Sequence, residues 1–530
     1  MTETAKTLQK RDVFSEIMGN EDTISLIFQM LAVNVTMDLD TKKKTRKMLY
    51  NMALLGRAFT GPALNSLWKV LPSMLPLFRL LPAFGLFGNT FIVEDIQEDD
   101  WLILDTYARR VRVLCLDSKG PAISPFVYMM LSRARSSPIL PALKELRLLD
   151  NHPGNLSDAF LSMGPNVEVL EFGETIVTNT EFLTPFILTA LQQSSVINEF
   201  RLRGSHTIDL RFVSKFSSLR RLELKLTNTH LTPQFFTALG HLDDLSDIQI
   251  HVGAPLPTAA PVTLRKEASG LSSSRRSRKH KFRSLKSFSA TGSISLLSRL
   301  LEFVELRNVT SFRIQEEANS TGIAESHWNQ CFQSLSTSTQ LEELEIVQFQ
   351  QTNSYAGVCL EARWMTPLCS LSHLKTLAVK NASFGSSDTD ISTLISSFPL
   401  LKTLILPEIC HASNGSFMST DSLINIANGC PLLEELRIPI GEKFLSARIL
   451  GAFQNQLIDS LKRPLRTLTI STSFGRLPNP DVVLLAQLVF RTFSYLHTLE
   501  GSGPNAANES WPQVREIYQA IQAEVKTFRA

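Results

Sequence analysis

The 530-residue sequence lacks the short motifs by which most catalytic sites are recognised. It contains no HExxH, no GxSxG, no GxxxxGK[ST] and no GxGxxG. These patterns are typical of zinc hydrolases, serine hydrolases, P-loop proteins and dinucleotide-binding enzymes. The ten histidines do not pair at metal-binding helical spacing. We therefore expect a protein that is not an enzyme and that holds no cofactor and no metal.

Cysteine is scarce and scattered, and no CxxC pair occurs. Spacing of this kind argues against a zinc site and against a disulfide framework, and it favours a reducing compartment. Several cysteines fall within apolar patterns, where the thiol acts as a small hydrophobic group. The six cysteines are Cys115, Cys331, Cys359, Cys369, Cys410 and Cys430.

Long apolar runs are also missing. Residues 1–20 are polar, lack the apolar stretch of a secretory signal, and are expected to be disordered. The longest apolar run, residues 70–93, is interrupted by Arg79 and three prolines, so we expect residues 71–108 to form a helical connector and not a membrane span. These features predict an intracellular protein, cytoplasmic and/or nuclear, without a membrane partner.

The chain has little net charge, and one segment supplies it. Nine Lys or Arg residues and one Glu lie between Arg265 and Lys286, whereas the remaining chain carries 44 basic and 49 acidic residues. The Ser, Gly, Pro and Arg content of residues 252–284 predicts a mobile basic loop. A nuclear-import signal, a contact for an acidic partner, a phosphorylation target and a merely solvated loop all remain open for it.

What the sequence has in abundance is a repeat. The phrase GCPLLEELRIPIG at 429–441 follows the pattern apolar-x-x-apolar-x-apolar, which is the strand signature of leucine-rich repeats. Weaker copies bring the total to fourteen predicted strands between residues 109 and 507, with starts 22 to 40 residues apart. Clear copies begin at Leu143, Leu219, Leu341, Leu374, Leu401 and Leu465.

Amphipathic helices are predicted between these strands. One example begins with Thr232 as N-cap and Pro233 at the first helical position. One strand and one helix per unit predict an α/β fold: a right-handed leucine-rich-repeat solenoid with a curved parallel sheet inside and helices outside. Residues 508–530 carry apolar residues at helical spacing, and we expect them to form a C-terminal capping helix.

Alternation along each strand predicts the surface that meets a partner. In LRRLELKL, Leu222 and Leu224 are expected to point into the core while the intervening residues point to the concave face. A merely solvated sheet face is the alternative for each residue, and the mixed charge argues against nucleic-acid binding. The predicted substrate-binding residues are Arg147, Arg203, Arg221, Glu223, Lys225, Glu345 and Arg437, with Gln249 and Thr469 at corresponding positions.

Residues 21–70 predict three short helices that are too apolar to bury their own side chains. The first carries Ile24 to Leu31, the second runs through Leu55 and Phe59, and the third begins at Pro62. The phrases ISLIFQML and ALLGRAFTGPALNSLW resemble the F-box, and LINIANGCPLLEELRI resembles the cysteine-containing repeat of F-box proteins. The segment LPSMLPLFRLLP is similar to the one that follows the F-box in many fungal members.

This resemblance implies a substrate-recognition subunit of an SCF-type ubiquitin ligase. An F-box binds a Skp-family adaptor and, through it, a cullin ligase, while the repeats hold a protein substrate. The resemblance assigns an adaptor-binding surface to Ile24, Ile27, Phe28, Leu31, Leu55, Phe59, Leu64 and Trp68.

A second hypothesis is a leucine-rich-repeat scaffold, or a regulator-binding protein, that is not attached to a ligase. Its N-terminal helices would cap the first strand edge of the solenoid. The exposure of the apolar helix residues separates the two. A cap buries Leu55 and Trp68 against the first repeat, whereas an F-box leaves Ile27, Phe28 and Leu31 free.

Overall fold

A computed structural model gives the structure of the chain, which divides into two compact units, Met1–Thr229 and His230–Ala530. The structure describes residues 20–87, 90–93, 96–116, 122–135, 137–149, 157–174, 180–229, 231–252, 280–317, 324–348, 360–382, 384–407, 418–440, 464–472, 479–502 and 510–529.

The first unit opens with three helices, α2 (Glu21–Met30), α3 (Leu39–Leu54) and α4 (Arg57–Trp68). Asn20 and Asp38 cap α2 and α3, because each side chain accepts a hydrogen bond from a backbone N–H in the first turn. Helix α4 packs against both others, and the buried Ser66 hydroxyl donates to the Phe28 carbonyl at 2.8 Å. The three helices share one small core.

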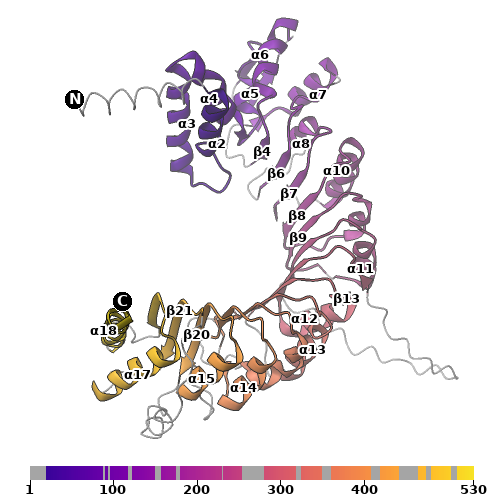
Figure 1. Ribbon diagram of the computed structural model, residues 1–530. Helices are drawn as coiled ribbons and strands as arrows, with labels where there is room; N and C mark the ends of the chain where they lie inside the picture. Colours follow the sequence, from indigo (N-terminus) through magenta and orange to yellow (C-terminus); the bar gives the residue numbers. More distant parts are fainter. Residues whose placement is uncertain are drawn as a thin grey trace, which may run out of the picture. The chain divides into compact units, whose positions relative to one another are not determined.

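A parallel sheet with connecting helices forms most of the rest of the first unit (Figure 1). Its strands are paired in the order β1 (Val70–Leu71), β4 (Val113–Leu116), β6 (Glu145–Leu148), β7 (Val169–Phe172), β8 (Glu199–Gly204) and β9 (Arg221–Leu226). Helices α6 (Glu98–Ala108), α7 (Pro125–Ala134), α8 (Ser157–Ser162), α10 (Thr180–Gln193) and the 3₁₀ helix η1 (Leu210–Lys215) connect them.

The register of this sheet lines up its buried side chains. Leu114, Leu146, Leu170, Phe200 and Leu222 are partners across five successive strands, and all are fully buried. Ring contacts continue this core into the helices, since Phe186 of α10 lies edge-on to Phe172 at 5.8 Å. The helices therefore cover this face of the sheet, and the opposite face, which we call the polar face, carries the alternate residues.

Residues 71–108 are not the helical connector that their prolines suggested. Among the described residues of this segment, only α5 (Leu75–Phe78) and α6 are helical. Strand β1 joins the parallel sheet, and β2 (Phe84–Phe87), β3 (Thr90–Val93) and β5 (Ala122–Ile123) form a small separate sheet. Phe84 and Phe91 stack across β2 and β3 at 4.9 Å. Aromatic and β-branched residues favour strands, and this preference outweighs the helical period here.

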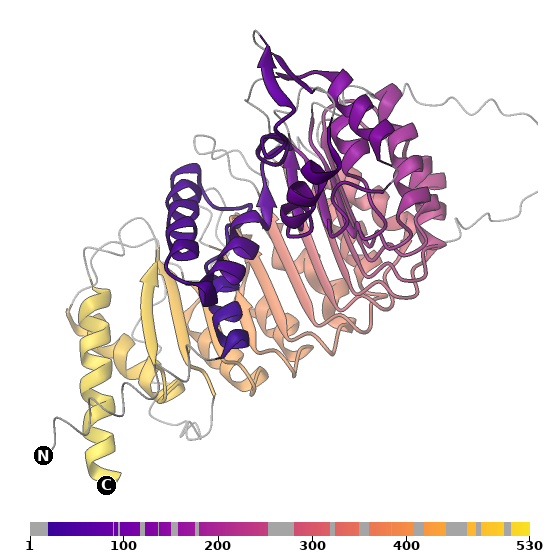
Figure 2. The same cartoon turned by 90° about the horizontal axis from the view of Figure 1, so that it is seen from above.

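The second unit repeats the same architecture, and its strands lie side by side (Figure 2). They are paired in the order β10 (Asp247–Val252), β12 (Ser287–Gly292), β14 (Ser311–Glu316), β15 (Glu343–Gln348), β17 (Thr376–Lys380), β19 (Thr403–Ile405), β20 (Glu435–Ile440), β21 (Thr467–Thr472) and β22 (Thr498–Ser502). The connecting helices are α11 (Pro233–Gly240), α12 (Ile294–Phe303), α13 (Ala324–Leu335), η2 (Ala362–Ser370), α14 (Asp388–Ser396), α15 (Thr420–Gly429) and α17 (Asn479–Thr492).

Local sequence explains where these helices begin. Thr232 caps α11 by accepting a hydrogen bond from the Phe235 N–H, as predicted.

Two short strand pairs form small additional sheets. They are β11 (His280–Lys281) with β13 (Val304–Glu305), and β16 (Leu360–Glu361) with β18 (Phe384–Gly385). The predicted bounds of the loop at 252–284 are wrong at both ends, because Val252 belongs to β10, residues 280–281 form β11 and Phe282 is buried. Residues 253–279 of that loop and residues 1–19 of the expected disordered N-terminus lie outside the described residues.

Helix α18 (Trp511–Arg529) covers the last strand of the second unit. A Cβ atom on Gly501 of β22 would lie 2.0 Å from Cδ1 of Trp511, so the indole rests directly on the strand backbone. The buried Tyr518 hydroxyl donates to the Phe493 carbonyl and accepts from the Leu496 N–H at 2.8 and 3.0 Å. The helix thus protects apolar surface that the sheet end would otherwise expose.

Each unit is a stretch of leucine-rich-repeat solenoid, with one strand of a parallel sheet per repeat and a helix or 3₁₀ turn on the return path. Every one of the fourteen predicted strands has a counterpart among the strands of the parallel sheet, and β1 is an additional strand there. Across the described parts of the chain, no helix combines the length and the apolar character needed to cross a membrane.

Candidate protein-binding surfaces

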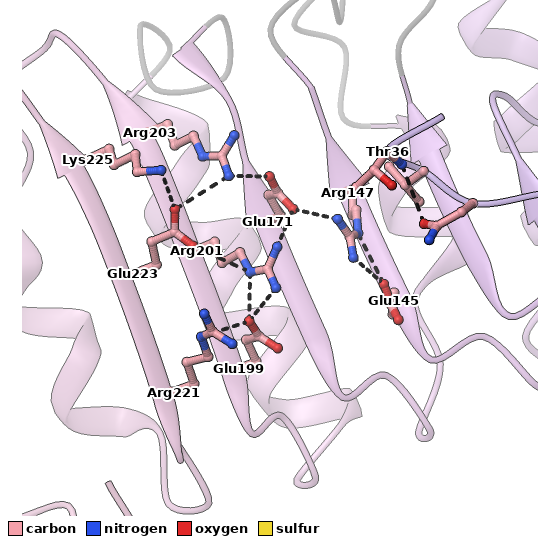
Figure 3. Close-up of polar contacts among 12 residues, drawn as sticks. Thr36, Glu145, Arg147, Glu171, Glu199, Arg201, Arg203, Arg221, Glu223 and Lys225 are labelled. Carbon is pink, nitrogen blue, oxygen red and sulfur yellow. Dashed lines mark hydrogen bonds and ion pairs between the residues drawn. The ribbon is translucent and has the colours of Figure 1, made fainter. Parts of the chain in front are cut away.

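Four charged residues of alternating sign cross the polar face of the first unit (Figure 3). Arg147, Glu171, Arg201 and Glu223 are partners across β6, β7, β8 and β9, and we call this row the charge ladder. Opposite charges that face each other on neighbouring strands stabilise a sheet. The row follows directly from the register, because these residues alternate with the buried leucines and phenylalanines.

Glu171 is the centre of the charge ladder. Its carboxylate lies 3.2 Å from Arg147, 3.4 Å from Arg201 and 3.2 Å from Arg203, and its side chain is 4% exposed. Burial without partners would make an ionised carboxylate costly. Three guanidinium groups supply the compensating charge and cover the carboxylate.

Glu223 occupies a similar buried position on β9, two strands away from Glu171 on β7. Burial acts to raise the pKa of Glu223, but the Lys225 hydrogen bond and the charges of Lys225, Arg203 and Arg201 outweigh it and hold the pKa below its usual value of 4.5. The Lys225 ammonium lies 2.8 Å from the carboxylate. The expectation that Glu223 is exposed was therefore wrong, because the longer cationic side chains around it cover it.

The other predicted residues of this face are more accessible. Arg147 is partly buried, and Arg203, Arg221 and Lys225 are 40%, 41% and 48% exposed. The prediction overlooked Glu145, Glu171, Glu199 and Arg201, although each occupies the same alternate position in its own strand. Applying the LRRLELKL alternation to VEVLEF and INEFRL would have found three of them: Glu171, Glu199 and Arg201.

The polar face of the second unit carries a smaller charged group. Glu345 on β15 lies 2.8 Å from Lys380 on β17 and 3.3 Å from Arg313 on β14. Arg437, Gln249 and Thr469 also lie on this face at half-buried positions. Their role in binding a substrate stays a prediction.

The predicted adaptor-binding residues separate into two groups. Ile24 and Phe28 lie in the core of the three-helix cluster, with Leu49 and Ala63, so they are structural and not available to a partner. Leu31, Phe59, Leu64 and Trp68 are half-buried. Ile27 and Leu55 are exposed. The F-box hypothesis expected Phe28 to remain free, but it lies on the inner side of α2, where α4 covers it.

Exposed apolar side chains gather on the outer side of α2. Leu26, Ile27 and Met30 share one helix face and are 59%, 42% and 80% exposed. None of these except Ile27 belongs to the predicted set. Leu54 and Leu55 are also exposed at the end of α3.

The predicted helix boundaries in this region were wrong. Helix α3 stops at Leu54, and α4 starts at Arg57 and not at Pro62. Phe59 therefore belongs to α4 and not to the second helix.

The three helices are also attached firmly to the sheet of their own unit. One residue, Lys69, separates α4 from β1, and its carbonyl accepts from the N–H groups of Arg112 and Val113. The Trp68 ring lies 4.8 Å from Tyr107 of α6. Val35, in the loop between α2 and α3, packs against a buried cluster on the polar face of β1 and β4, namely Val70, Val113 and Cys115.

Candidates for redox or metal chemistry are weak in the part of the chain that the structure describes. No three His, Cys, Asp or Glu side chains there gather in a group that could hold a metal ion. Burial raises the pKa of Cys115 to about 11 and that of Cys430 to about 12, so both thiols stay protonated at neutral pH. Cys430 is buried at the C-terminal end of α15.

No protein-family model and no curated protein matches the sequence. Among solved structures, the chain is similar to the internalin inlF of Listeria monocytogenes str. 4b F2365, at 11% sequence identity and a TM-score of 0.33. The similarity covers 83% of this chain and 95% of the internalin. The leucine-rich-repeat architecture is accordingly assigned from the strands, helices and register described above.

Proposed function

We propose that this protein is a substrate receptor that performs no bond chemistry: the polar face binds a protein target, and the exposed face of α2 binds an adaptor. The charge ladder carries this proposal. A row of buried carboxylates and guanidinium groups fixes charged side chains on a broad, rigid sheet, and repeat proteins use such surfaces for protein recognition.

The finer form of the proposal is a subunit of an SCF-type ubiquitin ligase, in which a Skp-family adaptor occupies α2 and a cullin ligase follows. It is supported by the F-box resemblance and by Leu26, Ile27 and Met30, which form an apolar helix face without a covering element among the described residues. Such faces mark protein interaction sites. The receptor would act by holding a target lysine near the ligase, which raises the effective concentration of the reacting groups.

Co-purification of the full chain with a Skp-family adaptor tests this form. The double variant Ile27→Asp/Met30→Asp places two charges on the exposed face of α2, and we expect it to abolish binding while leaving the helical core folded. Tyr50→Asp/Leu54→Asp on α3 is the matched control, since both residues are also exposed. A Phe28 variant is unsuitable, because loss of a buried ring would unfold the cluster.

A scaffold without a ligase is the second candidate, and the attachment of the helices to the sheet favours it. The packing of Val35 against Val113 of β4, the pairing of β1 with β4 and the Trp68–Tyr107 contact support a cap. Leu55, which a cap was expected to bury, is exposed. If folded wild-type protein binds no Skp-family adaptor, the ligase form fails and the cap assignment stands.

A further inference from the structure

Two positive charges lie side by side on the polar face of the first unit, next to the charge ladder. Arg203 on β8 and Lys225 on β9 are direct partners in the sheet register. Like charges directly opposite each other on neighbouring strands destabilise a sheet. They share one carboxylate oxygen, since Oε1 of Glu223 lies 3.4 Å from Arg203 and 2.8 Å from Lys225.

The carboxylates of this region lie beneath the cations. Glu171 and Glu223 are 4% and 7% exposed, whereas Arg203 and Lys225 are the two most accessible partners of these carboxylates. An approaching partner therefore meets guanidinium and ammonium groups first. The buried carboxylates hold these groups in place without presenting negative charge to the partner.

Arg203 has unused hydrogen-bonding capacity. Arg147 and Arg201 contact carboxylates through all three of their side-chain nitrogens. Arg203 contacts Glu171 and Glu223 only through Nη2, at 3.2 and 3.4 Å, and within the described residues its Nη1 contacts no carboxylate. Its Nε also has no partner there, but this atom is buried, so Nη1 is the donor left for a ligand. Lys225 likewise contacts a single carboxylate and has three N–H donors.

The net charge of the residues around Arg203 and Lys225 indicates which ligand group would bind there. The charge ladder, together with Glu145, Glu199, Arg203, Arg221 and Lys225, contains five positive and four negative side chains, a net charge of +1. One carboxylate would neutralise this excess, and its two oxygens can each accept from one cation. A phosphate carries about two negative charges at neutral pH and would overcompensate.

We propose that Arg203 and Lys225 bind one carboxylate side chain of an Asp- or Glu-containing segment of the protein target. This proposal rests on the proposed function, because it assumes that a target occupies the polar face of the first unit. It assigns the position of an acidic residue in the target and makes these two cations the determinants of specificity.

The test uses the full chain and a library of random-sequence peptides. Peptides are selected on the wild type, and dissociation constants are measured for each selected peptide and for its analogue with Glu→Gln or Asp→Asn. We expect an acidic residue to be enriched at one position, and its amide analogue to bind the wild type at least about tenfold more weakly, as the loss of a charge-assisted hydrogen bond predicts.

The same comparison is then made in the variant Arg203→Gln/Lys225→Gln, where the acidic peptide and its amide analogue should bind equally. Arg211→Gln is the matched control, because Arg211 forms an exposed ion pair with Asp209 away from the sheet, and the full preference for the acidic peptide should persist there. Circular dichroism establishes that each variant is folded.

A photo-crosslinker at Thr227, an exposed residue just after β9, separates the possible failures. Peptides that crosslink there but bind equally well as amide analogues overturn the carboxylate assignment and leave the polar face as the binding surface. Selected peptides that never crosslink there, or a library that yields no binder, count against both proposals. Binding that requires phosphoserine in place of the acidic residue overturns the assignment of a carboxylate.

Discussion

At the scale of single residues, the polar face depends on a few buried carboxylates that hold a larger number of cations. Glu171 and Glu223 each contact three positive side chains. Removing one carboxylate would leave neighbouring cations without their counter-charge, which costs more than losing an exposed ion pair. The same residues thus organise the candidate binding site and stabilise the sheet.

Glu223→Gln should lower the free energy of unfolding at neutral pH by about 1–3 kcal/mol. Because the pKa of Glu223 is depressed in the folded state, its contribution is complete above its ordinary pKa of 4.5 and is lost as the pH falls through the folded value. Urea unfolding between about pH 6 and about pH 3 should therefore show a smaller loss of stability in the variant than in the wild type. Glu168→Gln, in the exposed pair with Lys144, serves as the control. Parallel pH curves for wild type and Glu223→Gln would contradict the prediction.

Gly501→Ala should destabilise the second unit by about 1–3 kcal/mol, because the added methyl group would overlap the Trp511 indole. Thermal unfolding followed by Trp fluorescence measures the effect. Gly85→Ala is the companion variant, since its Cβ would meet no atom within 4 Å. Equal midpoints for Gly501→Ala and the wild type would show that the indole does not rest on β22 as described.

At the scale of elements, the sequence predicted the repeating strands well and the segments between residues 55 and 108 poorly. A strand of the main sheet needs only a few apolar residues at alternate positions, and each copy repeats the same signal, as in Leu222 and Leu224. Helix boundaries near Gly56 and the hairpin at Phe84 carry no repeated signal, and local preferences there compete. The burial of Glu223 depends on side chains from β8, so LRRLELKL alone could not reveal it.

Helix α4 contains a glycine directly before a proline. Gly61 and Pro62 both lie inside the helix, and a Cβ atom on the residue before a proline clashes with the proline ring in helical backbone. Gly61→Ala should therefore not raise the free energy of unfolding by the ~1 kcal/mol that alanine gains over glycine elsewhere in a helix. Urea unfolding followed by helical circular dichroism tests this, and a gain of that size would contradict it.

At the scale of the whole molecule, stability is distributed along the repeats, because each strand pairs only with its immediate neighbours. We expect local changes to have local effects. In hydrogen exchange, Gly501→Ala should reduce protection in β20, β21 and β22 of the second unit and leave β6, β7 and β8 of the first unit unchanged. Uniform loss of protection in both units would contradict this and indicate a single cooperative transition.

The one-residue junction between α4 and β1 sets how the first unit could present what it binds. With only Lys69 between helix and strand, the apolar face of α2 and the charge ladder belong to one compact unit. A docked target would then face a docked adaptor at a distance and an angle set by this short junction. Inserting a few glycines at this junction would leave the affinity of each surface for its own partner unchanged. The distance and angle between the bound target and the bound adaptor would then vary.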